Sequence, residues 1–255
     1  MRGKTLILLA ITALAGFPLQ AKAAITLGTA GDFAVLAGST VTNTGSSVIN
    51  GGDVGVSPGT AIDGFPPGIV VPPFTMHAAD AVASQAQLDL TTAYDAAAAL
   101  APTQVLTDTD LGTLTLTPGV YFFSSTAALT GRLTLNAQND PNAQFVFQIG
   151  STLTTASNSS VVTINGGSMP GSNVFWQVGS SATLGTGTAF EGHILALTSI
   201  TLTTGASIIN GSALARNGAV TLDGNTIVVP EPATLVVLAL GGVGMLLRRW
   251  RTARE

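Results

Sequence analysis

The chain has 255 residues, of which 46% are hydrophobic and only 9% are charged, and it contains 30 glycines and no cysteine. The lack of cysteine excludes a disulfide scaffold, and the abundance of Val, Ile and Thr with so little charge excludes a disordered chain. These properties indicate a single large all-β domain.

The net charge of −4 is unevenly distributed, because seven of the nine basic residues lie near the two ends of the chain. Between residues 24 and 229 only Arg132 and Arg216 remain, against eleven acidic residues, so this segment carries a charge of −9. A surface with so few cations cannot neutralise a phosphate backbone. The composition therefore argues against nucleic acid as a partner.

Residues 1–23 are predicted to be a secretory signal peptide. Arg2 and Lys4 precede a short apolar run, and small residues lead to Ala24, so we expect cleavage after Ala23. A retained transmembrane helix is the alternative, but the apolar run is short for a permanent span.

Residues 25–68 contain short alternating apolar runs separated by Gly and Asn, which predicts short strands and turns. After the prolines at 66–67 and 72–73 we expect one helix, from about residue 75 to 100, with Thr75 as its N-cap. Its apolar stripe recurs at spacings of three and four: Ala79, Ala83, Ala86, Leu90, Ala93, Tyr94 and Ala97. This stripe of mostly small side chains suits close packing on a flat sheet.

The strand pattern resumes after Pro102 and becomes repetitive. Residues 174–227 contain three similar phrases in which Leu184, Leu202 and Leu222 hold the same place, at separations of 18 and 20 residues. An earlier copy, FQIGS at 147–151, returns as WQVGS at 176–180. Such a period is typical of a solenoid with one coil per repeat and about 4.7–4.9 Å between coils. A helix that interrupts the coils in sequence must lie beside them in space.

The C-terminal segment, residues 230–255, resembles the PEP-CTERM sorting signal of Gram-negative bacteria. Its features are Pro230, Glu231 and Pro232, then a short apolar helix, then the basic residues Arg248 and Arg249. The uncharged stretch from 233 to 247 is short for a permanent span, and its basic flank should stay cytoplasmic. The resemblance implies transient inner-membrane insertion, an exosortase-type sorting enzyme as partner, and release to the cell surface or extracellular matrix. A plain membrane anchor is the alternative.

The segment between these two ends, residues 24–229, resembles the secreted ice-binding proteins. The resemblance is carried by the opening LGTAGDFAVLAGSTVTNTGSSVINGGDVGVSPG, by GFPPG before the helix, by LTPGVYFF after it, and by FVFQIGSTL, NVFWQVGSSATLG and GHILALTSITLTTGASI. It implies an all-β solenoid, namely a discontinuous right-handed parallel β-helix with one long α-helix packed alongside, and it implies an ice crystal surface as the partner.

Strong members of that family often carry Thr, then Ala or Gly, then any residue, then Thr or Asn on the ice-binding face. Residues 155–158 fit this motif fully, whereas 186–189 and 204–207 fit its first two positions. The candidate ice-binding residues are accordingly Thr155, Ser157, Asn158, Thr186, Thr188, Thr204, Ala206 and Ser207. Asp63, in a partial match, would be a poor member of such a face and would mark its edge. Adsorption of this kind requires no cofactor and no metal.

Two other classes of function compete with ice binding. An enzyme would need a carboxylate pair, for which Asp108 and Asp110 are the closest in sequence, or an acid–base pair such as Glu191 and His193 on a shared strand face. We interpret these residues as structural, so we predict no catalysis. A matrix or adhesin protein that binds extracellular polysaccharide remains the open alternative, because a solenoid fold does not specify its ligand.

Overall fold

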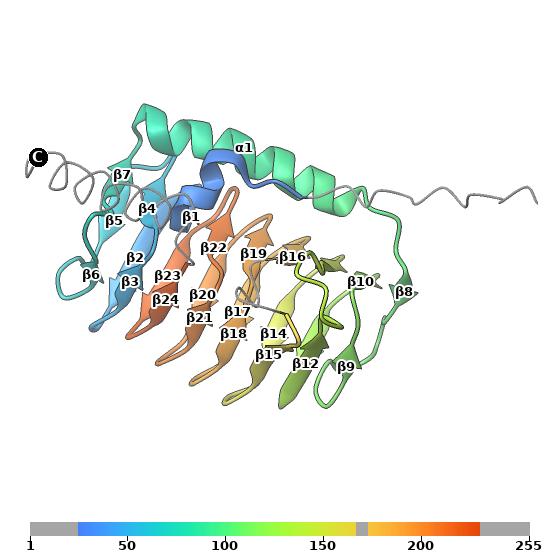
Figure 1. Ribbon diagram of the computed structural model, residues 1–255. Coiled ribbons are helices and arrows are strands. Elements are labelled where there is room, and N and C mark those ends of the chain that lie inside the picture. Colours follow the sequence, from blue (N-terminus) through green and yellow to red (C-terminus); the bar gives the residue numbers. More distant parts are fainter. Residues whose placement is uncertain (1–24, 167–172, 230–255) are drawn as a thin grey trace, which may run out of the picture.

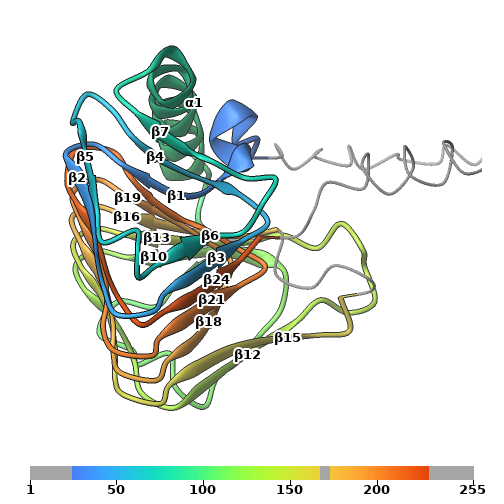
Figure 2. The same ribbon diagram turned by 90° about the vertical axis from the view of Figure 1, so that its left-hand side faces the viewer.

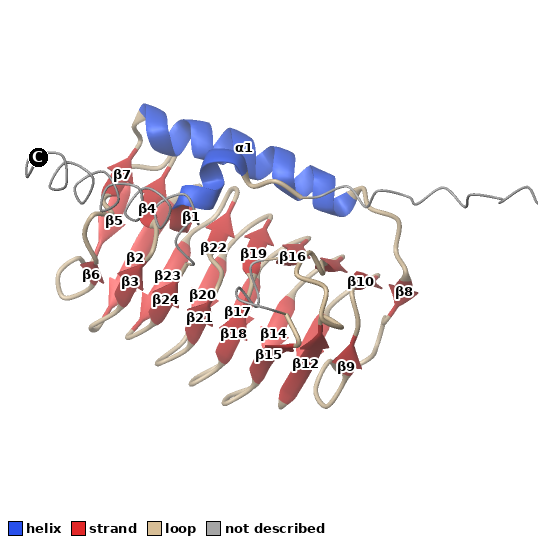
Figure 3. Ribbon diagram, viewed as in Figure 1, coloured by secondary structure: helices blue, strands red, loops and turns tan. Residues whose placement is uncertain are grey.

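The computed structural model describes residues 25–166 and 173–229, which form a stack of coils with a triangular cross-section (Figures 1 and 2). The predicted signal peptide and the predicted sorting segment lie outside the described residues. Three parallel sheets form the sides of the prism, and one α-helix lies along one of them (Figure 3). The predicted all-β solenoid with a helix alongside is thus confirmed.

The three sheets are called A, B and C in the order in which the chain visits them. Sheet A has nine strands, in the spatial order β7 (Met76–Ala78), β4 (Asp53–Val56), β1 (Phe33–Ala37), β22 (Ala213–Ala215), β19 (His193–Ala196), β16 (Val174–Val178), β13 (Phe145–Ile149), β10 (Gly119–Phe123) and β8 (Gln104–Val105). Sheet B has seven, in the order β11 (Ala127–Leu129), β14 (Leu153–Thr155), β17 (Ala182–Leu184), β20 (Ile200–Leu202), β23 (Val220–Asp223), β2 (Thr40–Thr44) and β5 (Ala61–Asp63). Sheet C has eight, in the order β6 (Ile69–Val70), β3 (Val48–Asn50), β24 (Thr226–Val228), β21 (Ser207–Ile209), β18 (Ala189–Glu191), β15 (Ser160–Ile164), β12 (Arg132–Asn136) and β9 (Thr115–Leu116).

The chain does not wind along the stack in one pass. The short 3₁₀ helix η1 (Gly28–Asp32) leads into β1, and the coils then proceed to the end of the stack that carries β7. Helix α1 (Ala81–Ala98) returns the chain along the outside to the opposite end, where β8 begins. Later coils fill the space between, so β22, β23 and β24 finish against β1, β2 and β3. The first and last coils are therefore neighbours, which is the discontinuity that the resemblance implied.

The sequence repeats coincide with the strand register. Leu184 lies opposite Leu202, and Phe147 lies opposite Trp176. The pairs are parallel, so equivalent residues of successive coils point in the same direction. The buried position of each repeat consequently forms one continuous column in the core.

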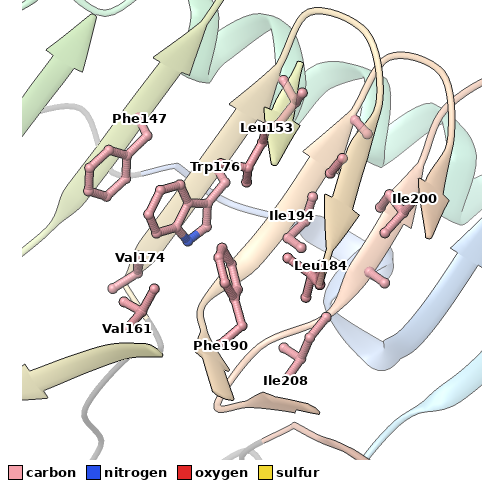
Figure 4. Packing of buried hydrophobic residues seen from close by; sticks show 14 of the residues in the cluster. Phe147, Leu153, Val161, Val174, Trp176, Leu184, Phe190, Ile194, Ile200 and Ile208 are labelled. Carbon is pink, nitrogen blue, oxygen red and sulfur yellow. The ribbon is translucent and has the colours of Figure 1, made fainter. Parts of the chain in front are cut away.

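The interior of the prism is filled by apolar side chains from all three sheets (Figure 4). It includes an aromatic stack in which the Phe147 and Trp176 ring centroids lie 3.9 Å apart and those of Trp176 and Phe190 lie 4.8 Å apart. Trp176 is fully buried, and its Nε1–H donates to the carbonyl oxygen of Glu191 at 3.0 Å. Burying a side chain of this size contributes about 1.5–3 kcal/mol or more to the free energy of unfolding, so these aromatic residues stabilise the coils to which they belong.

Helix α1 begins later than the sequence predicted. Its N-cap is Asp80, whose carboxylate accepts the backbone N–H of Ala83 at 2.9 Å, and this hydrogen bond holds the pKa of Asp80 below its usual range. Residues 76–78 instead form β7, which pairs with β4, so Thr75 is not the cap and His77 is not helical. The predicted stripe is confirmed from Ala83 to Ala97, whereas Ala79 lies outside the helix at φ 51°.

Helix α1 covers the outward side of sheet A. Its small buried side chains allow close contact with a row of sheet-A residues that includes Val146, Phe175 and Leu195. Gln148 in β13 closes the other helix end, because its Nε2 donates to the carbonyl oxygens of Ala97 and Leu100, both at 2.8 Å. Sheet A is therefore buried on both sides. No helix within the described part of the chain is long and apolar enough to cross a membrane.

Candidate functional site

Since α1 covers sheet A, the large regular surfaces that remain are the outward sides of sheets B and C, which we call face B and face C. Face B carries the outward residues of seven strands, and face C those of eight. Both have the same parallel backbone, with strands about 4.7–4.9 Å apart. Their side chains differ, and this difference identifies the candidate site.

Face B carries a column of threonines along its centre. Thr154 lies opposite Thr183, Thr183 opposite Thr201, Thr201 opposite Thr221, and Thr221 opposite Thr42. We call these five residues the threonine column. Each projects outward between two buried neighbours or beside one, as the alternation of a strand requires. The hydroxyls of Thr42 and Thr221 approach to 3.4 Å, which shows how closely the column stacks.

A second row of short side chains runs beside the threonine column, two residues earlier in each strand. Backbone hydrogen bonds between adjacent coils place Thr152, Ser181, Ser199, Ala219 and Thr40 in this row. The Ser199 Oγ accepts the N–H of Ala219 at 3.2 Å, so part of the row is tied to the backbone. Face B therefore presents hydroxyls and methyl groups on a net of about 4.8 Å across strands and roughly 6.7 Å along them.

The turns that join sheet B to sheet C form the B–C ridge, which comprises residues 156–158, 185–187, 203–205, 223–224 and 44–45. One residue of each turn has positive φ, and these residues are Asn158, Gly187, Gly205, Gly224 and Gly45. Glycine tolerates this conformation without strain, as asparagine does at lower frequency. The predicted site residues Ser157, Asn158, Thr186 and Thr204 are exposed on this ridge, at the border of face B.

Two predicted site residues, Thr155 and Thr188, are buried. Their exposed fractions are 3% and 0%, and their hydroxyls hydrogen-bond each other at 2.8 Å inside the prism. Thr155 Oγ1 also accepts the N–H of Gly185 at 2.9 Å. They point inward because Thr155 follows the outward Thr154 and Thr188 precedes the outward Ala189. Neither can contact an external surface, so both leave the candidate site.

Two further candidates also lie away from face B. Ala206 is fully buried, because its methyl group points into the core just after the ridge turn. Ser207 begins β21 and stands opposite Ala189 and Thr226 on face C. Each copy of the motif therefore spans the corner between two sheets. In 186–189 and 204–207 only the first two residues border face B, whereas in 155–158 the first residue is buried and Ser157 and Asn158 lie at the border.

Face B contains acidic residues only at its margins. Asp63 lies opposite Thr42 in β5, the terminal strand of the sheet, and so it marks the edge of the face. Asp223 lies at the ridge end of β23, where its carboxylate accepts the hydroxyl of Thr204. The centre of the face thus carries no formal charge.

Face C is less uniform in charge and polarity. Its outermost column contains Arg132, Ser207 and Thr226 together with the exposed apolar residues Val48 and Ile69. Glu191 lies on the same sheet, where burial raises the pKa of its carboxyl group and a hydrogen bond from the Thr163 N–H at 2.7 Å opposes the rise. A surface that mixes cation, acid and apolar groups offers no single repeating arrangement.

The acidic and histidine residues that could have formed a catalytic pair do not form one in the structure. Glu191 ends β18 in sheet C and His193 begins β19 in sheet A, because Gly192 turns the corner with φ 101°. The shared strand face predicted for this pair is therefore wrong, and His193 Nδ1 instead pairs with Ser212 Oγ at 2.8 Å. Asp110 accepts the N–H groups of Gly112 and Thr130 at 2.6 and 3.0 Å and so closes a turn. Over the described residues, no group of three or more His, Asp or Glu could hold a metal ion.

Part of the threonine column has a signal in the sequence that the family motif does not include. The repeats end in Thr-Leu steps at 183–184, 201–202 and 221–222. Since the leucine of each step is buried, the preceding threonine must point outward. Thr42 and Thr154 are followed by Asn43 and Thr155 rather than leucine, so only the strand register brings them into the column.

Comparison with known proteins places the chain in a family. The ice-binding-like family matches residues 35–228, and the PEP-CTERM protein-sorting motif matches residues 228–251. An ice-binding protein of Nostoc sp. (strain HG1) is 58% identical over 95% of this chain and 94% of its own length. One of Flavobacterium frigoris is 35% identical over 81% of this chain and 77% of its own length.

Solved structures agree with the sequence comparisons. An ice-binding protein from an Antarctic biological consortium superposes with a TM-score of 0.77 and 51% identity, covering 89% of this chain and 96% of that one. One from the Antarctic ascomycete Antarctomyces psychrotrophicus gives 0.77 and 43% identity, covering 82% of this chain and 100% of that one. On the match to residues 35–228 and on these identities, the chain belongs to the ice-binding-like family.

Proposed function

We propose that this protein binds ice by adsorption through face B. The observation that carries the proposal is the threonine column, in which five threonines occupy matched positions on adjacent strands. The relatives named above as ice-binding proteins support the same function. Of the residues predicted from the sequence, Ser157, Asn158, Thr186 and Thr204 remain in the proposed site as its ridge border.

The chemistry of threonine suits this task. Its β-branched side chain has few rotamers, so its methyl and hydroxyl groups stay in place with little loss of entropy. The hydroxyl can donate one hydrogen bond and accept two, which anchors ordered water, while the methyl group excludes disordered water. Because a formal charge would orient its own hydration shell against the lattice, the absence of charge at the centre of face B favours an ice-like water layer.

Adsorption explains activity without any bond being made or broken. Ordered water on face B merges with the surface of the crystal, and growth continues only between bound molecules. The ice front then curves, and curvature lowers the local freezing point. No residue acts as a catalyst and no cofactor takes part in this mechanism.

We further propose that the segment after Val229 directs export. The motif match at 228–251 supports recognition by an exosortase-type enzyme, transient insertion of the segment in the inner membrane, and release to the surface or extracellular matrix. A secreted location agrees with the function, because ice forms outside the cell.

Recrystallisation assays of the purified body, residues 24–229, test the ice-binding proposal. The strand pairs and both core clusters of the described residues lie within this range, and the match to the Antarctomyces structure covers 82% of this chain and 100% of that one. We expect ice grains to stay small at micromolar concentration and faceted crystals to form in a thermal hysteresis cell. Normal coarsening, together with capture by an extracellular polysaccharide, would instead establish the adhesin alternative.

A further inference from the structure

The point at which the chain leaves the stack lies opposite face B. Strand β24 is the last strand of the body, and it belongs to sheet C. Each coil passes from sheet A to B to C, so Val229 follows β24 at the corner where sheet C meets sheet A. In the triangular cross-section of Figure 2, the corner between sheets C and A is the one that does not touch sheet B.

Val229 is held firmly at this corner. Its N–H donates to the carbonyl oxygen of Asn50 at 3.0 Å, and its side chain is only 7% exposed. The carbonyl of Val229 packs so closely on Gly51 that a Cβ there would lie 2.1 Å from its oxygen. Gly51 also has φ 85°, so glycine is required at this place for two reasons. The exit direction of the chain is thus fixed up to its last described residue.

No spacer separates this anchored residue from the sorting segment. The motif match begins at residue 228, inside β24, and Pro230 follows Val229 directly. A proline restricts the backbone of the residue before it, so the sequence adds a further constraint on Val229. The uncharged stretch at 233–247, flanked by arginines, has the chemistry to enter a lipid bilayer.

The exit also lies within the stack rather than at one end. In sheet C, β24 has β3 and β6 on one side and five strands on the other. A molecule held there is attached along its side rather than at one tip of the stack. Face B, which runs the length of the stack, is then turned outward over its whole extent.

We propose that the C–A corner, defined by Asn50, Gly51 and Val229, is the membrane-facing side of the tethered protein, so that a bilayer holding the C-terminal segment displays face B to the medium. The inference rests on the proposed function only in taking face B as the ice-binding surface. The orientation itself follows from the exit geometry. The protein would bind ice before its release as well as after it.

Fluorescence energy transfer on phospholipid vesicles tests the orientation without ice. The chain contains no cysteine, so single variants Asn50→Cys and Thr201→Cys of residues 24–255 accept one donor dye each. With the acceptor in phosphatidylcholine vesicles, we expect transfer from position 50 to exceed that from position 201 by about twofold or more, because the two sites differ in depth by more than the ~10 Å between packed sheets. Equal transfer, or stronger transfer from position 201, would overturn the proposal.

A linker variant and an ice readout complete the experiment. Inserting about ten Gly and Ser residues between Val229 and Pro230 uncouples the body from the sorting segment, since such linkers behave as flexible coils. We expect this insertion to remove most of the difference in energy transfer between positions 50 and 201. Vesicles carrying the unlabelled chain should adsorb to ice. If the energy transfer is as expected but the vesicles do not adsorb to ice, the result would contradict ice binding by face B and support the orientation.

Discussion

Face B and face C share one backbone architecture and differ in what they can bind. Both consist of short parallel strands stacked in register. On face B, Thr201 has threonines opposite it on both sides, whereas on face C, Thr226 has Ser207 and Val48 as neighbours. The solenoid therefore has two faces with regularly spaced strands. The outward residue of each strand decides whether a face repeats one chemical group.

The sharpest way to break this comparison is to place one large side chain on each face. Thr201→Tyr raises a bulky ring from the centre of the threonine column, so we expect thermal hysteresis to fall at least about tenfold, because the ring holds the rest of face B away from the ice surface. Thr226→Tyr is the matched control on face C and should keep the activity of the unchanged chain. Circular dichroism verifies that both variants fold. Equal loss in both variants would refute the assignment of face B.

Substitutions on the B–C ridge should have a smaller effect. Thr186 and Thr204 are exposed at the border of face B, so Thr186→Tyr and Thr204→Tyr disturb its margin and leave the threonine column clear. We expect each to lower thermal hysteresis by only about two- to fivefold, since the threonine column can still reach the ice surface. A complete loss in either variant would move the centre of the site to the ridge.

Removing the marginal charge should strengthen face B slightly. Asp223→Asn keeps an oxygen that can accept the hydroxyl of Thr204 but removes the carboxylate charge. We expect a gain of up to about twofold in recrystallisation inhibition, because the uncharged amide orients nearby water less strongly than the carboxylate does. Reduced inhibition at unchanged stability would show that the carboxylate takes part in binding.

The buried threonine pair should affect stability and not activity. Thr188→Val retains the shape but removes a hydroxyl that bonds Thr155 Oγ1 at 2.8 Å and the Ala156 carbonyl oxygen at 3.2 Å. We expect the free energy of unfolding to fall by about 1–2 kcal/mol. Thermal unfolding measures this loss, and thermal hysteresis near 0 °C should stay unchanged. A loss of hysteresis in the folded variant would be evidence against this separation of roles.

The smallest expected effect concerns the acid on sheet C. Because the folded pKa of Glu191 is raised above its ordinary value of 4.5, the folded state holds this proton more tightly than the unfolded state. This contribution to stability is present below pH 4.5 and is lost as the pH rises through the folded pKa. Glu191→Gln should abolish this slope.

Melting temperatures at pH 4 and pH 7 measure the slope. Relative to the unchanged chain, we expect Glu191→Gln to gain on the order of 1 °C at pH 7 compared with pH 4. Ice activity should not change at either pH, since Glu191 is not on face B. Parallel pH profiles for the two proteins would contradict the assignment of this proton uptake to Glu191.

The sequence alone determined the fold because its signals are local and repeated. The Leu184, Leu202 and Leu222 period predicted coils, and the stripe from Ala83 to Ala97 predicted a helix beside them. Both predictions rest on the alternation of buried and exposed positions within a few residues, and this alternation is visible in the sequence itself. The helix starts later than its sequence pattern predicts because residues 76–78 pair with β4, a contact made across more than twenty residues.

Only the tertiary structure decided which residues share the site. A motif such as 155–158 is continuous in sequence, yet it crosses a corner, so Thr155 is buried while Ser157 is exposed. Conversely, Thr42 and Thr221 are 179 residues apart and have adjacent hydroxyls, because the first coil stacks on the last. The period of the sequence indicates how the strands repeat. Which threonines align depends on the register between strands, and the corner from which the chain leaves depends on how the coils stack. Both are properties of the packed structure.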